Sequence, residues 1–287
     1  MAISRVGGPT EILSSTDYSG AITVPSDTEI LIIGVTGYDN TSDRVAIGAT
    51  IDSAAMTKVL GAQTVDHFQG SIFYKFSPST GTPTLSVDFG TLVAGAKIIY
   101  ACYKGIDTSG IRDNDGMHDL TPDLFDTKTL TASTGDLIVA FLFAASGSDS
   151  VTGPTYQNLT QITAYNTRYN AAVAAWAENS PTGNVSVGLS AWTNAEDGGI
   201  CAVVLKQAAA AVSIEQEGFR FRNDDGSESA ATWKANQDTN ITLAAATVVR
   251  IRMLLNATGD PASIGAQLEY RYKPSGGAFG AWGKVVS

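Results

Sequence analysis

Acidic side chains gather in one short stretch of the sequence, and their spacing comes nearest to a metal site. Asp113, Asp115 and Asp119 lie within seven positions of one another. Closely spaced carboxylates are the oxygen ligands that calcium takes in proteins. However, the spacing does not match an EF-hand loop, and aspartates in turns commonly accept hydrogen bonds from their own backbone. We therefore treat these three residues as weak candidates for a metal site and assign no metal or cofactor.

Tryptophans form a second group of interest, because a large apolar ring with a polar edge can stack on a sugar or pack in a core. Trp192 and Trp282 have loop-like neighbours such as Asn194 and Gly283. We expect these two rings to be exposed and treat them as candidates for glycan contact. Trp176 and Trp233 lie inside strand patterns, and we expect them in the core.

Catalytic patterns are absent from the sequence. Its two histidines, His67 and His118, have no cysteine or histidine at metal-ligand spacing, and neither a G-x-S-x-G elbow nor a P-loop occurs. Glycoside hydrolysis uses two carboxylates held at a defined separation, whereas the acidic residues around His118 are contiguous in sequence. We predict no catalytic residues and no enzymatic activity, with glycan hydrolysis as an alternative that turnover of polysaccharide would establish.

The two cysteines, Cys102 and Cys201, each end an apolar segment. A disulfide forms between them if the two segments are neighbours. Alternatively, both are small buried hydrophobic residues. We favour the second interpretation, because two cysteines in 287 residues do not make a disulfide scaffold.

Charge is sparse and unevenly distributed. Charged residues make up 16% of the chain and hydrophobic residues 44%. Residues 1–212 carry 10 Lys and Arg against 20 Asp and Glu, whereas residues 213–287 carry 8 of each. The acidic part disfavours a phosphate backbone, so we expect no nucleic-acid partner. A weakly charged surface is typical of proteins that pack against copies of themselves or against neighbours in an assembly.

Targeting signals are also absent from the sequence. No stretch approaches the roughly 18 consecutive apolar residues of a transmembrane helix, so we expect no membrane partner. The first residues lack the apolar core of a secretory signal. We expect the protein to be made in a cytosol.

The elements that must position these residues are short strands in a repeated order. Turn signals separate them, a pattern typical of an all-β domain. The segment 105–126, polar and rich in glycine, is predicted as a long loop between the two repeats. Similar strand candidates occur at 29–35, 71–76, 85–87 and 98–102 in the first repeat, and at 136–142, 172–176, 185–187 and 200–204 in the second.

The last seventy-five residues show a different pattern. Three segments alternate apolar and charged residues: 219–222, 249–253 and 268–272. Such alternation puts one face of a strand in a core and the other toward solvent or a partner. We expect cross-strand charge pairs on the outer face, with the arginines opposite Gln267 and Glu269; these arginines are Arg220, Arg222, Arg250, Arg252 and Arg271.

We predict an all-β chain of two antiparallel β-sandwich domains of jelly-roll or immunoglobulin-like type. Residues 1–210 form an acidic domain with a weak internal duplication. Residues 213–287 form a smaller sandwich of five or six strands. The Ala-rich segment around residue 210 is the connector.

A group of segments in the C-terminal part belongs together: 217–228, 231–235, 240–243 and 268–272, with Trp282. Together they resemble a recurring C-terminal module of tailed-bacteriophage structural proteins. Residues 33–38 and 55–59 in the first domain are similar to β-sandwich domains of phage and bacterial surface proteins. These modules occur on heads, tails and fibres alike, and the family has no agreed catalytic residues to carry over.

The resemblance implies a structural protein on the exterior of a tailed-phage particle, as a head decoration or fibre or as a tail-associated protein. Its expected partners are other virion proteins of capsid or tail and copies of itself, and its expected location is the virion. It would act by packing and multivalent display. The alternative is a carbohydrate-binding adhesin on tail or fibre, which would contact a host surface glycan through Trp192 and Trp282.

Overall fold

The computed structural model of the chain divides into two compact units, unit 1 (Met1–Ala208) and unit 2 (Ala209–Ser287). The described residues form strands, bridges and turns without a helix, and their sheets are antiparallel, so the all-β prediction is confirmed for them. In this part of the chain, therefore, no helix has the length and apolarity to cross a membrane. The described residues are 2–38, 46–62, 68–90, 95–119, 127–145, 156–169, 172–189, 197–210, 213–223, 225–226, 230, 232–244, 247, 249–259, 269–270 and 276–284.

The first half of unit 1 contains two sheets. The larger has the order β1-β9-β3-β7-β6 and the smaller the order β2-β8-β4-β5. The larger sheet consists of β1 (Ser4–Ser14), β9 (Gly95–Lys104), β3 (Ile30–Tyr38), β7 (Phe68–Phe76) and β6 (Thr57–Ala62). The smaller sheet consists of β2 (Tyr18–Ala21), β8 (Thr84–Asp88), β4 (Gly48–Ile51) and β5 (Ala54–Ala55).

The second half of unit 1 repeats this order. Its larger sheet is β10-β17-β12-β15-β14 and its smaller sheet is β11-β16-β13. The larger sheet consists of β10 (Asp113–Asp119), β17 (Asp197–Leu205), β12 (Leu137–Ala145), β15 (Ala172–Asn179) and β14 (Thr160–Tyr169). The smaller sheet consists of β11 (Thr127–Leu130), β16 (Val185–Leu189) and β13 (Tyr156–Gln157).

Each repeated stretch of the sequence takes the same place in its own half. Residues 29–35 lie at the centre of one larger sheet as β3, and residues 136–142 lie at the centre of the other as β12. Both central strands pair with a strand from the end of their own half, β9 or β17. The order of strands is therefore the same in both halves, apart from the short β5.

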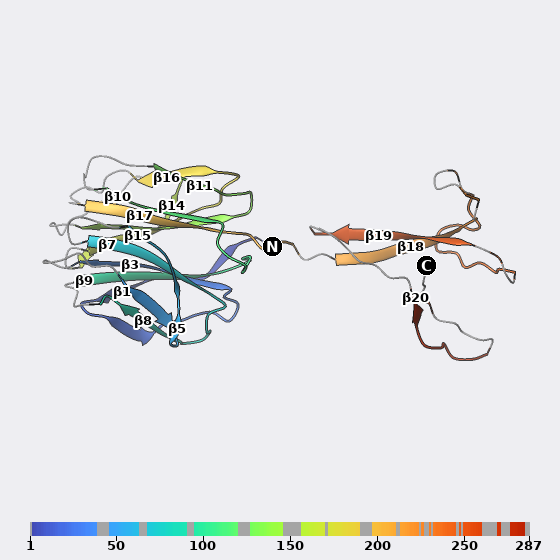
Figure 1. Cartoon of the computed structure of the whole chain (residues 1–287), viewed down its shortest axis with the longest axis horizontal. Coiled ribbons are helices and arrows are strands. Elements are labelled where there is room, and N and C mark those ends of the chain that lie inside the picture. Colours follow the sequence, from blue (N-terminus) through green and yellow to red (C-terminus); the bar gives the residue numbers. More distant parts are fainter. Residues whose placement is uncertain are drawn as a thin grey trace. The chain divides into compact units, whose positions relative to one another are not determined.

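The four sheets of unit 1 are stacked as layers, with apolar cores between them (Figure 1). The middle core lies between the two larger sheets and contains Phe141 and Trp176. Each outer core lies between a larger and a smaller sheet; Ile33 belongs to one and Leu142 to the other. Both faces of each larger sheet are thus covered, which explains why residues 30–35 are apolar without alternation.

Two glycines let the larger sheets approach each other. A Cβ added at Gly34 in β3 would lie 2.1 Å from Cδ2 of Phe141 in β12. A Cβ added at Gly70 in β7 would lie 2.2 Å from the ring of Phe143. Real Cβ atoms do not come this close to other atoms, so only glycine leaves room for these rings in the middle core.

The prediction of a long loop at 105–126 is wrong in its middle. Asp113–Asp119 forms β10, which pairs along its whole length with β17 at the edge of a larger sheet. This strand lacks an apolar alternation because polar residues are tolerated, and favoured, at the edge of a sheet.

Unit 2 contains less regular structure in its described residues. β18 (Ser213–Arg222) pairs with β19 (Arg250–Thr258), and β20 (Glu269–Tyr270) pairs with β21 (Gly283–Lys284). The backbone of residues 232–238 runs beside β18, where the Lys234 amide donates to the Phe221 carbonyl at 3.0 Å. The predicted sandwich of five or six strands stays a prediction.

The register of β18 and β19 contradicts the expected charge pairs. Arg220 lies opposite Arg252 and Arg222 lies opposite Arg250, instead of opposite acidic residues. Glu269 lies opposite Lys284 in the other pair of strands. Like charges directly opposite one another oppose pairing, so the strands must be held together by other contacts.

Candidate functional site

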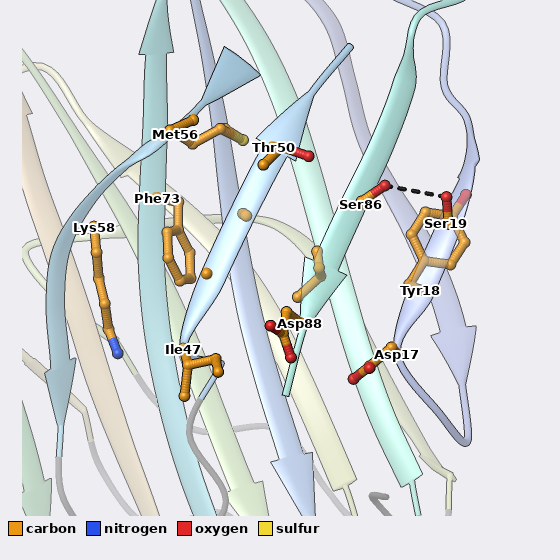
Figure 2. Close-up of a pocket in the computed structure, with 14 residues that line it drawn as sticks. Asp17, Tyr18, Ser19, Ile47, Thr50, Met56, Lys58, Phe73, Ser86 and Asp88 are labelled. Atoms are coloured by element: carbon orange, nitrogen blue, oxygen red, sulfur yellow. Dashed lines mark hydrogen bonds between the residues drawn. The ribbon is translucent and has the colours of Figure 1, made fainter. Parts of the chain in front are cut away.

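A pocket opens on unit 1 where the smaller sheet of the first half meets β6 and β7 (Figure 2). Its volume is about 560 Å³, a size common among small-molecule sites. The lining mixes hydroxyl and carboxylate groups with apolar side chains. The residues labelled in Figure 2 are Asp17, Tyr18, Ser19, Ile47, Thr50, Met56, Lys58, Phe73, Ser86 and Asp88.

Hydrogen bonds fix the polar side of this pocket. One carboxylate oxygen of Asp17 accepts from the Phe89 amide at 2.9 Å, and one of Asp88 accepts from the Gly90 amide at 2.6 Å. The hydroxyls of Ser19 and Ser86 lie 3.0 Å apart across β2 and β8 (Figure 2). These groups are positioned by the strands that carry them, and they are suited to hydrogen bonding.

Lys58 supplies a cation at the other side of the pocket. Its Nζ donates to the Ala46 carbonyl at 2.9 Å and lies 5.7 Å from the centre of the Phe73 ring. Partial burial lowers the pKa of Lys58, because water is withdrawn from the ammonium. The ammonium is thus held against a ring and a carbonyl, although Lys58 as a whole residue is exposed.

The described residues that line the pocket offer groups for binding. They include no histidine or cysteine, and the Ser19 and Ser86 hydroxyls contact each other instead of a general base. Nucleophilic catalysis by serine requires such a base. What the arrangement can do is hold a small polar molecule by hydrogen bonds.

Unit 2 displays a surface of a different kind. Large hydrophobic side chains that are exposed in the described residues lie mostly in this unit, although it is much the shorter of the two. Unit 1 contributes only Leu13 and Ile47 to them. Those of unit 2 are Ile214, Trp233, Leu243, Ile251, Leu254, Leu255, Phe279 and Trp282.

The arginines of β18 and β19 gather around one tryptophan. The guanidinium of Arg220 lies 4.3 Å from the centre of the Trp233 ring, and those of Arg222 and Arg252 lie 5.8 Å from it. Arg220 also donates from Nε to the Ala235 carbonyl at 2.9 Å. Cation–π attraction of this kind offsets part of the repulsion between the arginines.

Two buried side chains between the larger sheets, Trp176 and Tyr103, belong to a polar network that also includes the partly buried Glu178 and the exposed Arg5. The Trp176 indole donates to the Tyr103 hydroxyl at 2.9 Å, and that hydroxyl donates to Oε1 of Glu178 at 2.6 Å. Arg5 pairs with the same oxygen at 2.7 Å. Burial, together with the nearby Glu178 carboxylate, raises the pKa of Tyr103 well above its ordinary value. The network therefore joins β1, β9 and β15 through a phenol that stays neutral, and its role is structural.

The predicted metal residues lie on β10 instead of in a loop. Asp113 accepts from the Asn114 amide at 2.8 Å and from the Thr131 amide at 2.6 Å, so it ties β10 to the segment after β11. Asp115 lies on the same strand, and the side chain of Asp119 is outside the described residues. Across the described residues, no group of three or more His, Cys, Asp or Glu side chains could hold a metal ion.

The tryptophan predictions had mixed outcomes. Trp282 is 62% exposed and Trp176 is fully buried, as expected. The prediction for Trp233 is wrong: it is 37% exposed, because it packs on arginines at the surface rather than in a core. Trp192 lies outside the described residues.

Both cysteines are buried and form no disulfide with each other, as the second interpretation had it. Cys102 faces an outer core and Cys201 faces the middle core, so a larger sheet separates them. Burial raises the pKa of Cys102 to about 11. Neither thiol is placed for chemistry.

The sequence did not indicate the pocket of unit 1. Its polar residues come from segments that are far apart in the sequence: Asp17 directly precedes β2, Thr50 lies in β4 and Ser86 lies in β8. They form no motif, and only the fold brings them together. Comparison of the chain with protein-family models, with curated proteins and with solved structures gives no match.

Proposed function

We propose that this chain is a structural protein on the exterior of a tailed-phage particle, as a head decoration or fibre or as a tail-associated protein. It acts by packing and multivalent display and has no enzymatic activity. Its partners are capsid or tail proteins and copies of itself, and its location is the virion. The assignment to a tailed phage rests on the resemblance described above, which is carried by residues 217–228, 231–235, 240–243 and 268–272 with Trp282, and by residues 33–38 and 55–59.

The observation that carries a structural role is the exposed apolar surface of unit 2. A two-stranded sheet is marginally stable by itself in water, and contiguous exposed apolar side chains mark interaction sites. Leu254 is 48% exposed and Leu255 is 51% exposed, although they are neighbours on one strand and face opposite ways. A chain with such a surface is completed by other chains in an assembly.

The layers of unit 1 support the further proposal that this part consists of two β-sandwiches of jelly-roll or immunoglobulin-like type. Each would comprise one larger and one smaller sheet around an outer core. The larger sheets then join the two sandwiches back to back through the middle core. Unit 2 would be the second domain, connected near residue 210.

Cryo-electron microscopy of the intact particle tests the proposed function. We expect density for this chain repeated over the shell lattice or along the tail. Density confined to the tail tip or its fibres would instead favour host recognition. Absence of the chain from the particle would contradict both functions.

A carbohydrate-binding adhesin remains the second candidate, because two aromatic rings of unit 2 are exposed close together in sequence. Phe279 is 56% exposed and Trp282 is 62% exposed. If they bind a host glycan, Trp282→Ala abolishes binding in a glycan array and leaves incorporation into particles unchanged. Leu13→Ser, which removes an exposed apolar side chain of unit 1, serves as the control. Unchanged glycan binding by Trp282→Ala would rule out this site.

A further inference from the structure

The two halves of unit 1 carry the same pair of hydroxyls on their smaller sheets. Ser19 in β2 lies opposite Ser86 in β8, and Thr129 in β11 lies opposite Ser186 in β16. The hydroxyls are 3.0 Å apart in the first pair and 2.8 Å apart in the second. Both β8 and β16 alternate these serines with residues of an outer core, so the hydroxyls face away from the core. Differences around this shared framework show what is particular to each half.

The first half adds two carboxylates and a hollow to this framework. Asp88 lies opposite Gly48 of β4, where a Cβ added to the glycine would meet open space among the described residues. Asp17 accepts a hydrogen bond from the Phe89 amide, which places its carboxylate beside Asp88. The positions that correspond to Asp17, Asp88 and Gly48 in the second half are held by Thr127, Gly188 and Gln157. The pocket is therefore a feature of one half and not of the repeated fold.

The two carboxylates set one requirement for a ligand of this pocket. Asp17 and Asp88 are both exposed and lie side by side at one end of it (Figure 2). The backbone amides of Phe89 and Gly90 occupy the Oδ1 atoms, and within the described part of the chain no hydrogen bond or ion pair reaches the Oδ2 atoms. Like charges side by side oppose strand pairing. Because an ionised carboxylate only accepts hydrogen bonds, the ligand must donate at this end.

The remaining walls supply donors and an apolar surface. The Lys58 ammonium has three donors, one of which goes to the Ala46 carbonyl. The hydroxyls of Ser19 and Ser86 can each donate and accept. Ile47 borders the pocket and is 62% exposed, although large hydrophobic side chains of unit 1 are mostly buried. A matching ligand carries groups that both donate and accept, together with an apolar face.

We propose that this pocket binds one neutral sugar ring, a hexopyranose unit of a glycan. Hydroxyls of the ring donate to the Oδ2 atoms of Asp17 and Asp88, and these charge-assisted hydrogen bonds are the strongest contacts. Ser86 and Lys58 bind further oxygens of the sugar, and its C–H face lies against Ile47. The volume of about 560 Å³ accommodates a ligand of this size. The site goes beyond the proposed function and is distinct from the exposed rings of unit 2.

Two other ligands of carboxylates match the pocket less well. Calcium takes six to eight oxygen ligands, whereas the described residues contain no group of three or more His, Cys, Asp or Glu side chains that could hold a metal ion. An organic ammonium would pair with the carboxylates, but Lys58 would repel it and its own donors would stay unused. A neutral ring with several hydroxyls uses both the acceptors and the donors of the lining.

Saturation-transfer NMR on the full-length chain tests the proposal. The probes are methyl glycosides of glucose, galactose, mannose and N-acetylglucosamine, each at about 10 mM, above the millimolar dissociation constants of weak sites, with EDTA present. We expect saturation of at least one glycoside by the wild type. Gly48→Gln, which fills the hollow as Gln157 does in the second half, should abolish it, and the matched control Gln157→Gly should not. Absence of transfer to all four glycosides, or equal transfer in both variants, overturns the proposal.

Two further variants test the polar contacts without changing the shape of the pocket. Asp88→Asn keeps an acceptor for the Gly90 amide but removes the charge, and should weaken binding of the glycoside about 10-fold. Ser86→Ala should weaken binding, whereas Ser186→Ala, the equivalent change in the second half, should not. Thermal unfolding checks that each variant is folded. Wild-type affinity in Asp88→Asn, or equal losses in the two serine variants, contradicts the proposal.

A titration with calcium chloride and with methylammonium chloride addresses the cationic ligands. We expect neither to shift the backbone amide signals of Phe89 and Gly90, next to the two carboxylates. Saturable shifts with either cation, in a protein that binds none of the glycosides, would assign the pocket to a cation and overturn the proposal.

These results can be told apart from those on the proposed function. If Trp282→Ala abolishes saturation of the glycoside while Gly48→Gln does not, the sugar lies on unit 2; the inference then fails and the second candidate function is favoured. If the pocket variants behave as expected but the chain is absent from the particle, the proposed function fails and the sugar site of unit 1 stands.

Discussion

Strands β9 and β19 each pair with an antiparallel neighbour along their length, β9 on both edges and β19 on one, but they differ completely in burial. In β9, nine of ten residues are buried, whereas β19 contains no buried residue. Both follow an antiparallel partner along their length. The difference lies in layers: β9 belongs to a sheet with apolar cores on both faces, and β19 belongs to a two-stranded sheet. Backbone pairing is therefore enough to form a strand, whereas burial of its side chains requires a second layer.

This comparison separates two sources of stability in one chain. In unit 1, duplication supplies the layers internally, because each larger sheet covers the other. In unit 2, the described residues supply pairing and surface contacts while apolar side chains stay exposed. Unit 1 thus supplies the layers that cover its own larger sheets, whereas the described residues of unit 2 leave large apolar side chains exposed.

The largest expected effect is in the middle core. Phe141 is fully buried and stacks on Phe143, with ring centres 6.0 Å apart. Phe141→Ala should lower the free energy of unfolding by about 3–5 kcal/mol, because it removes a buried ring and leaves a cavity. The matched change Leu254→Ala in β19 should cost less than about 0.5 kcal/mol. Urea unfolding monitored by circular dichroism measures both, and similar losses would contradict the contrast between the units.

The close approach of the larger sheets leads to a second prediction. Gly34→Ala places a methyl group against the Phe141 ring, and such overpacking typically costs about 1–3 kcal/mol. Gly48→Ala in β4 meets open space and should be neutral or stabilise by up to about 1 kcal/mol. Thermal unfolding of the two variants decides the point; a Gly34→Ala protein as stable as wild type would show that the sheets can separate freely.

Much of unit 1 could be predicted because its pattern was repeated. Residues 29–35 and 136–142 are apolar without alternation, and such runs indicate strands covered on both faces. β10 was missed because Asp113–Asp119 is polar, and an edge strand needs no apolar face. The repeat itself contained the missing signal, since the first half begins with the edge strand β1.

Alternation in unit 2 indicated the faces correctly but not their surroundings. Phe219 and Arg220 do lie on opposite faces of the sheet, as the pattern predicts. Alternation cannot reveal which residues lie opposite on the neighbouring strand, so the Arg220–Arg252 pair was unexpected. Nor can it reveal whether a cover exists within the chain. The pocket of unit 1 was unpredictable for a similar reason, because long-range pairing assembles it.

The thiol of Cys102 predicts a pH dependence that is specific to unit 1. Its pKa is raised by burial from 9.0 to about 11, so the folded state keeps a proton that the unfolded state releases. The corresponding stability is fully present below about pH 9 and is lost as the pH rises toward 11. Across this pH range, the free energy of unfolding of the wild type should fall by about 2 kcal/mol more than that of Cys102→Ala. Urea unfolding at several pH values measures both proteins. If the wild type and Cys102→Ala lose the same free energy of unfolding across this pH range, the Cys102 thiol is not held neutral in the core.

The smallest expected effect concerns the arginine face of unit 2, where surface contacts take the place of layers. Trp233→Leu removes the ring that lies 4.3 Å from the Arg220 guanidinium, which should lower the stability of this unit by about 0.5–1 kcal/mol. Trp282→Leu, a change at a more exposed ring of the same unit, should have no measurable effect. Hydrogen exchange at the amides of β18 and β19 reports on this unit alone. Faster exchange in Trp233→Leu but not in Trp282→Leu would show that the cation–π contact holds the two strands together against the repulsion of their arginines. Equal exchange in both variants would show that backbone pairing alone is enough to hold the strands together.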